Sequence, residues 1–322
     1  MSEIVLQVGT RAYKLWSSMR ITRSLEALAA TFTLQAVEGD AVRIDVGSAC
    51  EIRLGKSLVM TGWVEERNEQ VSSSGHTLRI SGRCKTGDLV DCSIEKPCQY
   101  RSIAAALLLG QLLKPYGLKL EGTVEATLNH FVLNEGETVH EAMDRIARLA
   151  GVWLTSTGEG HVSIVKLPSA ISASLTAASV IDADAQSSWK DRHSVIEVRS
   201  SRQGDDSSHG SALFSSGSGR DAAILRHRPL CLNYDNVNPK KRAAWEVTVR
   251  AARGERLNVT VMGWHAKEGG LWWPGQLIDV TIPSLRIKCS MLLVEVTFSS
   301  SDQGTRSELV MSPPNAYKVE PV

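Results

Sequence analysis

The sequence predicts a mostly β fold with an α/β insertion, in which two β-barrel domains flank a smaller α/β domain. Short segments with alternating apolar and polar residues recur near both ends of the chain, with turn residues between them. Stretches with helical periodicity stand in the middle instead. The chain has 322 residues, 43% hydrophobic and 22% charged, so each domain can bury a core of its own.

The first β-barrel domain is expected over residues 1–92. Its clearest hairpin signal is Gly55-Lys56, where Gly holds the first central position of a two-residue type II′ turn. Regularly spaced short strands of this kind form a small barrel or sandwich. The expected strands cover residues 2–8, 31–37, 50–54, 57–65 and 76–82.

The α/β insertion is expected over residues 93–168. An Ala- and Leu-rich helix is predicted at 102–113. A second helix begins at a capping box formed by Thr138 and Glu141, carries apolar residues on one stripe and ends at Gly151. The strands expected after it cover residues 152–156 and 161–167.

The second β-barrel domain is expected over residues 169–322, after a linker of small residues at 168–179. A Gly- and Ser-rich segment at 202–220 is predicted to be a mobile surface loop. A basic helix is predicted at 239–253, because Asn238 suits the N-cap and Pro239 the first helical position. The expected strands cover residues 195–199, 222–225, 257–262, 277–282 and 308–311.

The basic helix and the segment after it hold four of the eight tryptophans. No pair of carboxylates and no Ser, His or Cys set is concentrated there, so a contact surface is favoured over a pocket. The other interpretation is a β-domain core covered by one helix. The candidate interface residues are Arg242, Trp245, Arg250, Arg253, Trp264, Trp272 and Trp273.

The formal net charge of +1, from 36 basic and 35 acidic residues, argues against a bulk binder of polyanions. A local basic excess does occur at 226–228 and 240–242, together with Arg250, Arg253 and Arg256. It could meet an acidic protein surface, steer assembly or touch nucleic acid in a channel. A solvated face is the alternative.

Four patterns resemble parts of catalytic sites, but each lacks a residue or a fixed geometry that the chemistry requires. Gly55-Lys-Ser57 lacks the earlier Gly of a phosphate loop, because Cys50 stands there. His140-Glu-Ala-Met-Asp144 lacks the second His of a zinc-protease helix. Asp205-Asp-Ser-Ser-His209 lies in a predicted loop without a packed frame, and the carboxylates near Trp189 have no fixed separation. We expect no catalytic residue, cofactor or metal ion.

We expect no signal peptide, because residues 4–8 are too short an apolar run, and no apolar run in the sequence is long enough to span a membrane. Its six cysteines include no C-x-x-C pair, so a zinc site is not expected. We expect reduced core or surface thiols.

One run of residues resembles a family signature. Gly82-Arg-Cys-Lys-Thr-Gly-Asp-Leu-Val-Asp-Cys-Ser93 is similar to the "GRSxTxDLVDCS" pattern of the baseplate hub proteins of Mu-like contractile-tailed phages, with Lys85 and Gly87 as departures. The likeness spans residues 5–317. Further matches occur at Gly62-Trp-Val64, Gly136-Glu-Thr138, Arg226-His-Arg-Pro-Leu230, Arg242-Ala-Ala-Trp-Glu246, Gly263-Trp264 and Leu271-Trp-Trp-Pro274.

This resemblance implies a homotrimer in which each subunit carries two tail-tube-like barrels, so that six similar barrels join a sixfold tail tube to a threefold spike. The implied partners are the tail tube protein, the central spike protein and other baseplate proteins. DNA would pass through the channel without specific binding. The implied location is the baseplate of the virion tail, assembled in the host cytoplasm. No catalytic residue carries over.

The resemblance also suggests where subunits meet. Closed rings require complementary head-to-tail surfaces, and Trp and Arg are enriched at interface hot spots. The candidate interface residues above are therefore expected to form such a surface. Two alternatives stay open: a module that binds peptidoglycan, since the helix after Gly136-Glu-Thr138 is similar to LysM-type folds, and a cell-wall hydrolase.

Overall fold

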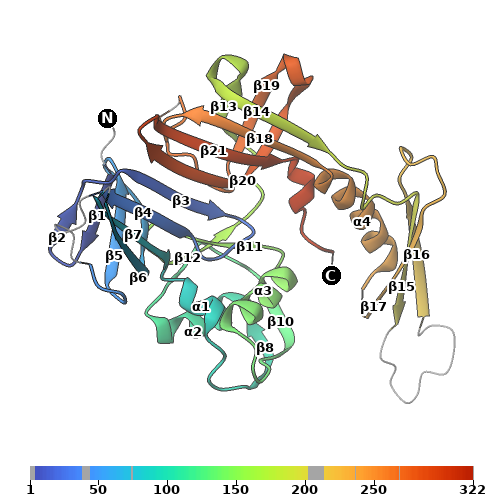
Figure 1. Cartoon of the computed structure of the whole chain (residues 1–322). Coiled ribbons are helices and arrows are strands. Elements are labelled where there is room, and N and C mark those ends of the chain that lie inside the picture. Colours follow the sequence, from blue (N-terminus) through green and yellow to red (C-terminus); the bar gives the residue numbers. More distant parts are fainter. Residues whose placement is uncertain are drawn as a thin grey trace.

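The computed structural model describes residues 4–37, 44–73, 75–201, 214–235, 237–267 and 269–321. Figure 1 shows two β modules side by side, an insert of helices and short strands below one of them, and an arm that projects from the other. None of the helices within the described ranges is long and apolar enough to cross a membrane.

The N-terminal module contains the first seven strands. They are β1 (Ile4–Val8), β2 (Arg11–Tyr13), β3 (Ser18–Ser24), β4 (Thr31–Val37), β5 (Ala49–Leu54), β6 (Ser57–Ser72) and β7 (Gly75–Cys84).

The insert follows, and it has its own apolar core. Its elements are α1 (Gly87–Asp91), β8 (Gln99–Ala104), α2 (Ala105–Leu113), η2 (Lys114–Tyr116), β9 (Leu120–Glu121), β10 (Thr127–Val132), α3 (Val139–Ala150), β11 (Trp153–Ser156) and β12 (Val162–Val165). The predicted capping box is confirmed, because Thr138 Oγ1 accepts from the Glu141 amide while the Glu141 carboxylate accepts from the Thr138 amide.

The C-terminal module is split by the arm. The module contains β13 (Ile171–Thr176), η3 (Ala177–Ser179), β14 (Val180–Ser187), β18 (Glu255–Met262), β19 (Leu277–Ile282), η5 (Pro283–Leu285), β20 (Ile287–Ser301), β21 (Gly304–Ser312) and η6 (Pro314–Tyr317). The arm contains β15 (Val195–Ser201), β16 (Phe214–Arg220), β17 (Pro229–Asp235) and α4 (Pro239–Arg253). As predicted, the Asn238 side chain caps α4, accepting from the Lys241 amide at 3.2 Å.

The two modules share one 13-stranded sheet, in the order β14-β18-β21-β20-β3-β4-β7-β6-β5-β1-β2, with β19 also paired with β20 and β13 paired with β19. The modules meet where β20 pairs antiparallel with β3. The mostly β prediction is confirmed. Among the described strands the path is open, so closure of each module into a barrel stays a prediction, as do the domain ranges 1–92, 93–168 and 169–322.

The two modules repeat one strand order. The sequence β3-β4-β7-β6-β5 in one module matches β14-β18-β21-β20-β19 in the other, and every neighbouring pair is antiparallel. The outermost pairs differ, since β1 runs antiparallel to β5 whereas β13 runs parallel to β19. The chain therefore contains a duplicated β module whose copies differ at one edge.

The repeat holds residue by residue in the long hairpins. Ser72 pairs with Gly75 at the tip of the first, and Ser301 with Gly304 at the tip of the second. Each hairpin has one bulge, just after Val64 in β6 and just after Leu293 in β20. The offset is constant, because 293 − 64 and 304 − 75 both equal 229.

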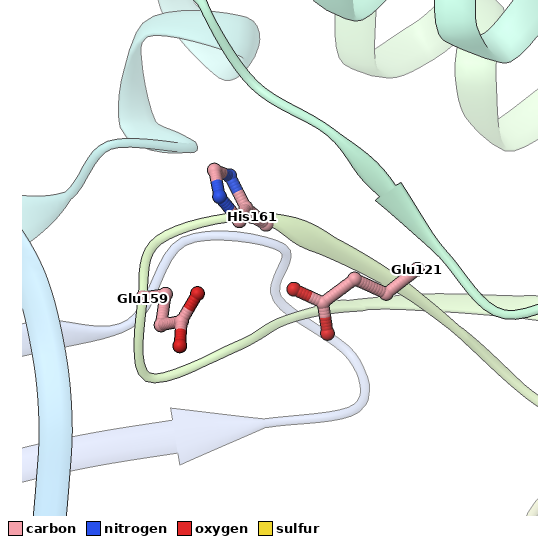
Figure 2. A group of neighbouring side chains, drawn as sticks. All are labelled: Glu121, Glu159 and His161. Atoms are coloured by element: carbon pink, nitrogen blue, oxygen red, sulfur yellow. The ribbon is translucent and has the colours of Figure 1, made fainter.

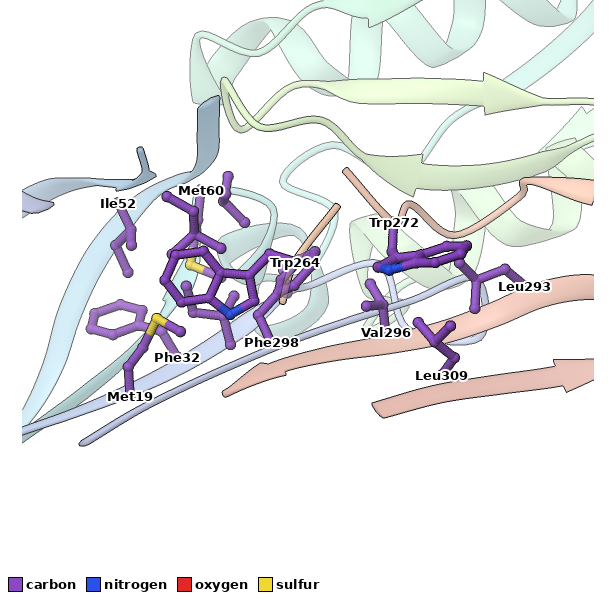
Figure 3. Close-up of a cluster of buried hydrophobic side chains, with 14 of the residues drawn as sticks. Met19, Phe32, Ile52, Met60, Trp264, Trp272, Leu293, Val296, Phe298 and Leu309 are labelled. Atoms are coloured by element: carbon purple, nitrogen blue, oxygen red, sulfur yellow. The ribbon is translucent and has the colours of Figure 1, made fainter. Parts of the chain in front are cut away.

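The core runs through both modules without a break. Figure 3 shows the Trp264 indole beside Met60 of the N-terminal module and Phe298 of β20, while Trp272 packs near Leu293. The modules are therefore held together by apolar burial as well as by the β20–β3 hydrogen bonds.

Arg23 on β3 lies at this joint and is only 2% exposed. Its Nη1 donates to the Val59 carbonyl at 2.7 Å, and its Nη2 donates to the carbonyl and, at 3.1 Å, to the hydroxyl of Ser156. Its guanidinium carbon lies 4.1 Å from the ring centroid of Trp273. Burial lowers the pKa of Arg23 to about 10, so the group stays charged at neutral pH. One side chain thus connects both modules and the insert.

Four local predictions are wrong. The helix expected from residue 102 begins at Ala105, because Ser102 has a φ of 51° and belongs to β8. The linker at 168–179 contains β13, whose small residues pair with β19. Residues 222–225 form a turn rather than a strand. In the segment 202–220, residues 214–220 form β16, and residues 202–213 lie outside the described ranges.

Arg23→Ala is expected to lower the free energy of unfolding by roughly 3 kcal/mol, because it leaves two buried carbonyls without donors and removes the contact with Trp273. Urea unfolding followed by tryptophan fluorescence measures the loss. Arg20→Ala is the matched control on the same strand, since its exposed pair with Glu308 should contribute at most about 1 kcal/mol. Equal losses in the two variants would contradict a special role for Arg23.

Candidate functional site

The candidate interface residues fall in two places. Arg242, Trp245, Arg250 and Arg253 all lie on α4 and line one cavity of about 740 Å³. The other three tryptophans lie in the segment between β18 and β19. The structure therefore brings the four residues of α4 together and separates them from the remaining three.

Arg242 is the most enclosed charge in the first group, with 5% of its surface exposed. Its guanidinium carbon lies 4.0 Å from the ring centroid of Tyr234 and 4.6 Å from that of Trp245. It pairs with Glu246 at 3.0 Å and also with Glu320 near the end of the chain. Arg242 therefore presents no solvated basic face within this chain, because its guanidinium is enclosed by aromatic rings and carboxylates.

Glu246 is the shared partner in this cluster. It accepts from Arg242 on one oxygen and from Arg250 on the other, the latter at 2.7 Å. Burial opposes its ionisation, but the hydrogen bonds and charges of the two arginines outweigh burial and hold the pKa of Glu246 below its ordinary value. Glu246 therefore stays ionised at neutral pH, and its ion pairs with Arg242 and Arg250 stabilise the arm.

Three side chains donate hydrogen bonds to backbone carbonyls of the segment after β21. The indole N–H groups of Trp153 and Trp245 donate to the carbonyls of Tyr317 and Lys318, at 3.0 and 2.9 Å. Arg253 Nε donates to the Ala316 carbonyl at 3.4 Å. This segment therefore joins the insert, through Trp153, to α4.

The cavity lies between α4, α3 and this C-terminal segment. Charged side chains from all three line it, including Asp144 and Arg148 of α3 and Lys318. Its carboxylates and basic groups largely face one another, as in the exposed Asp144–Arg148 pair and the Arg250–Glu246 pair. We find no nucleophile held against a base among its described lining residues.

The three remaining tryptophans are not the exposed surface that the sequence suggested. Trp264 is 1% exposed and Trp272 is 3% exposed, so the expectation of exposed aromatics is wrong for both. Trp273 is half-buried against Arg23. Trp264 Nε1 donates to the Ser299 carbonyl at 3.1 Å, which anchors this segment to β20. Their apolar rings fill the core that the two modules share.

Part of the basic excess at 226–228 is also structural. Arg228 donates to the backbone carbonyls of Trp189 and Lys190, at 3.0 and 2.8 Å. Nearby, Arg192 and Asp221 form a partly buried pair at 2.8 Å, and the Arg192 hydrogen bond holds the pKa of Asp221 below its ordinary value. These contacts attach the arm to the end of β14.

Among the described residues, one group has metal-ligating side chains close together. Ligand atoms of Glu121, Glu159 and His161 lie within 4.8 Å of one another on the surface of the insert (Figure 2). The Nδ1 of His161 accepts from the Lys119 amide at 3.4 Å. A metal-bound imidazole normally donates through its second nitrogen, so this contact is the reverse of what a metal ligand needs. The group is better described as a surface cluster.

The sequence interpretation missed the free strand edges. Among the described strands, β14 pairs only with β18, and the second half of β6 pairs only with β7. The residues of β14 are mostly exposed, and small Ala residues alternate there with Asp, so no run of large apolar residues marked it as a strand. An exposed tryptophan, Trp189, stands just after it and is 46% exposed.

Three family models match successive parts of the chain. Residues 3–84 match the N-terminal domain of Mu phage baseplate assembly protein GpP-like, and residues 86–166 match the second domain of baseplate hub protein gp44-like. Residues 236–320 match the fourth domain of Mu phage baseplate assembly protein GpP. The chain is also 27% identical to baseplate hub protein gp44 of Escherichia phage Mu, covering 98% of this chain and 89% of that protein.

Solved structures with the same fold include two tail proteins. The 43 kDa tail protein of prophage MuSo2 from Shewanella oneidensis is 28% identical with a TM-score of 0.86, covering 98% of this chain and 99% of that one. A tail protein from Neisseria meningitidis MC58 is 22% identical with a TM-score of 0.81, covering 97% and 96%. A type VI secretion component of E. coli, described as similar to T4 tail proteins gp27 and gp5, shares the fold at 11% identity with a TM-score of 0.57, covering 98% and 79%.

Glu246→Gln is expected to lower the free energy of unfolding by roughly 3 kcal/mol, because it leaves the charges of Arg242 and Arg250 without their shared counter-ion. Glu197→Gln is the matched control, since its pair with Arg199 is exposed and should contribute less than about 1 kcal/mol. Urea denaturation compares the two. Losses of the same size would show that burial of the Glu246 cluster adds nothing.

The same carboxylate predicts a pH dependence. The folded pKa of Glu246 lies below its ordinary value of 4.5, so the unfolded chain binds the proton more readily. Its contribution to stability should be complete above pH 4.5 and should disappear as the pH falls through the lower, folded pKa. Thermal unfolding midpoints recorded from pH 7 to pH 3 should fall less steeply for Glu246→Gln than for the native chain. Parallel curves would refute this.

Proposed function

Because this chain belongs to the GpP- and gp44-like baseplate hub proteins of Mu-like phages, we propose that it forms a homotrimeric ring at the centre of a tail baseplate. The ring adapts a sixfold tail tube to a threefold central spike. One face continues the tube, the opposite face holds the spike, and other baseplate proteins surround it.

The observation that carries this proposal is the duplicated β module. Three copies of a chain with two similar modules present six modules around an axis, while the chain itself repeats three times. The matching strand orders, hairpin tips and bulges make the two modules suitable for similar positions in such a ring. One kind of subunit can therefore bind a sixfold tube on one face of the ring and a threefold spike on the other.

Two further features support a structural role with a channel. The arginine and tryptophan clusters on α4 and at the β20–β3 joint hold the fold together rather than a substrate. The formal net charge of +1 suits a lumen through which DNA passes without specific binding. The fold likeness to a type VI secretion component described as similar to gp27 and gp5 supports a place beside a spike.

The solution mass tests the ring. Light scattering of the purified chain, alone and co-expressed with its spike protein, should give a chain assembly of about three times 35.0 kDa in at least one of the two samples. Negative-stain images of that assembly should show a ring with a lumen. A chain that stays monomeric in both samples, or that assembles with twofold symmetry, would refute the proposal.

A further inference from the structure

The free edges of β6 and β14 correspond, in the duplicated module, to the two edges that pair as β20 and β3 inside the chain. We propose that residues 66–71 of β6 pair antiparallel with residues 183–188 of a second copy, at the β14 edge. The sheet then continues from subunit to subunit. This inference rests on the proposed ring and names the strands and the register that close it.

The joint inside the chain provides the template. Residues 295–300 of β20 pair antiparallel with β3, and Thr297 lies opposite Thr22 with their hydroxyl oxygens 3.0 Å apart. Arg20 of β3 reaches across β20 and pairs with Glu308 of β21 at 2.9 Å. In the duplicated module, β6 corresponds to β20 and β14 corresponds to β3.

The residue before the bulge makes an equivalent backbone hydrogen bond in β6 and in β20. The Val64 amide donates to the Ser48 carbonyl at 3.0 Å, and the Leu293 amide donates to the Gln276 carbonyl at 2.9 Å. Beyond this point β20 receives β3, whereas the described part of β6 has no partner on that side. Residues 66–71 of β6 are exposed, so the edge is open to another strand.

The edge of β14 likewise matches that of β3. Ser18 lies opposite Gln35 in one module, and Asp182 lies opposite Thr260 in the other. The strands also end alike. The Ser24 hydroxyl accepts from the Glu26 amide at 3.1 Å, and the Ser188 hydroxyl accepts from the Lys190 amide at 3.3 Å. The same local turn therefore ends both strands at equivalent positions.

The ion pair at the internal joint has an equivalent at the proposed contact, in which the acidic and basic residues have exchanged places. The position equivalent to Arg20 is Asp184, and the position equivalent to Glu308 is Arg79. Both Asp184 and Arg79 are exposed. Pairing β14 with β6 in the template register would place Asp184 of one copy near Arg79 of the other. The bridge across the middle strand is thus reproduced between opposite charges.

Exposed apolar side chains mark the same edges. Leu25, whose amide donates to the Val294 carbonyl at 2.8 Å, is 5% exposed because it packs at the internal joint. Its equivalent is Trp189, which is 46% exposed. On the opposite edge, Val71 is 80% exposed. The proposed pairing would cover both, and a tryptophan is an effective anchor for an interface.

The register follows from the template. Asn68 should lie opposite Gln186, as Thr297 lies opposite Thr22, and Gln70 opposite Asp184. Each chain offers one β6 edge and one β14 edge, so the contact is head to tail. It repeats between subunits the relation that already joins the two modules of one chain, as a closed ring of similar modules requires.

Disulfide cross-linking tests the register. In a background with the exposed Cys92, Cys231 and Cys289 replaced by Ser, Asn68→Cys combined with Gln186→Cys should form intermolecular disulfides with oxidised glutathione. Non-reducing gels should show dimer and trimer bands that reducing agent removes. The matched control is Asn68→Cys with Asp182→Cys, about 13 Å out of register, which should not cross-link.

The outcomes separate this inference from the proposed ring. Cross-links in the first pair alone would support the pairing. A trimer by light scattering with no cross-link in that pair, or with equal cross-linking in the control, would overturn the strand pairing and leave the ring standing. A chain that stays monomeric with and without its spike protein would overturn both.

A charge exchange tests the same contact without cysteines. Arg79→Glu or Asp184→Arg alone should weaken trimer association about fivefold, because each places like charges together. The two substitutions combined should restore association to near the native value. Sedimentation at several protein concentrations measures the change. Additive weakening in the double variant would contradict the proposed Arg79–Asp184 contact.

Discussion

The pairing of β20 with β3 is the contact on which the rest of this structure depends. It joins two copies of one β module into a single sheet, and the apolar core follows the sheet across the joint. Arg23 lies at this joint. Its side chain contacts the sheet of the N-terminal module, the insert and an aromatic ring of the C-terminal module. A buried cation without a carboxylate partner is costly unless dipoles surround it. Here carbonyl oxygens and an indole face supply them.

The sequence predicted the elements whose signal is local. The capping box at Thr138, the Asn238-Pro239 start of α4 and the alternating strands of the N-terminal module are confirmed, because each depends on neighbouring residues. The β13 strand was missed because four of its six residues are Ser, Ala or Thr and its partner, β19, is about one hundred positions away. Non-local pairing of this kind leaves little trace in composition.

The tryptophans show a second limit of sequence-based prediction, because their burial could not be predicted from the residues around them. A cluster of aromatic and basic residues is typical of an interface, but it is equally typical of a well-filled core. Only the fold shows that Trp264 and Trp272 are buried in the core that the two modules share, while the Trp245 indole donates to the backbone of the C-terminal segment. The free edges of β6 and β14 consist mostly of exposed residues that form no sequence motif, so the features that suit a second copy became visible through the duplication.

The C-terminal segment is gripped by its main chain, since Trp153, Trp245 and Arg253 all donate to carbonyl oxygens there. A carbonyl is the same whatever side chain follows it. Residue 318 is exposed, so its side chain is free to change over evolutionary time while the path of the segment stays fixed. Ala316 and Tyr317 are buried, so selection should act on them as well as on the three donors.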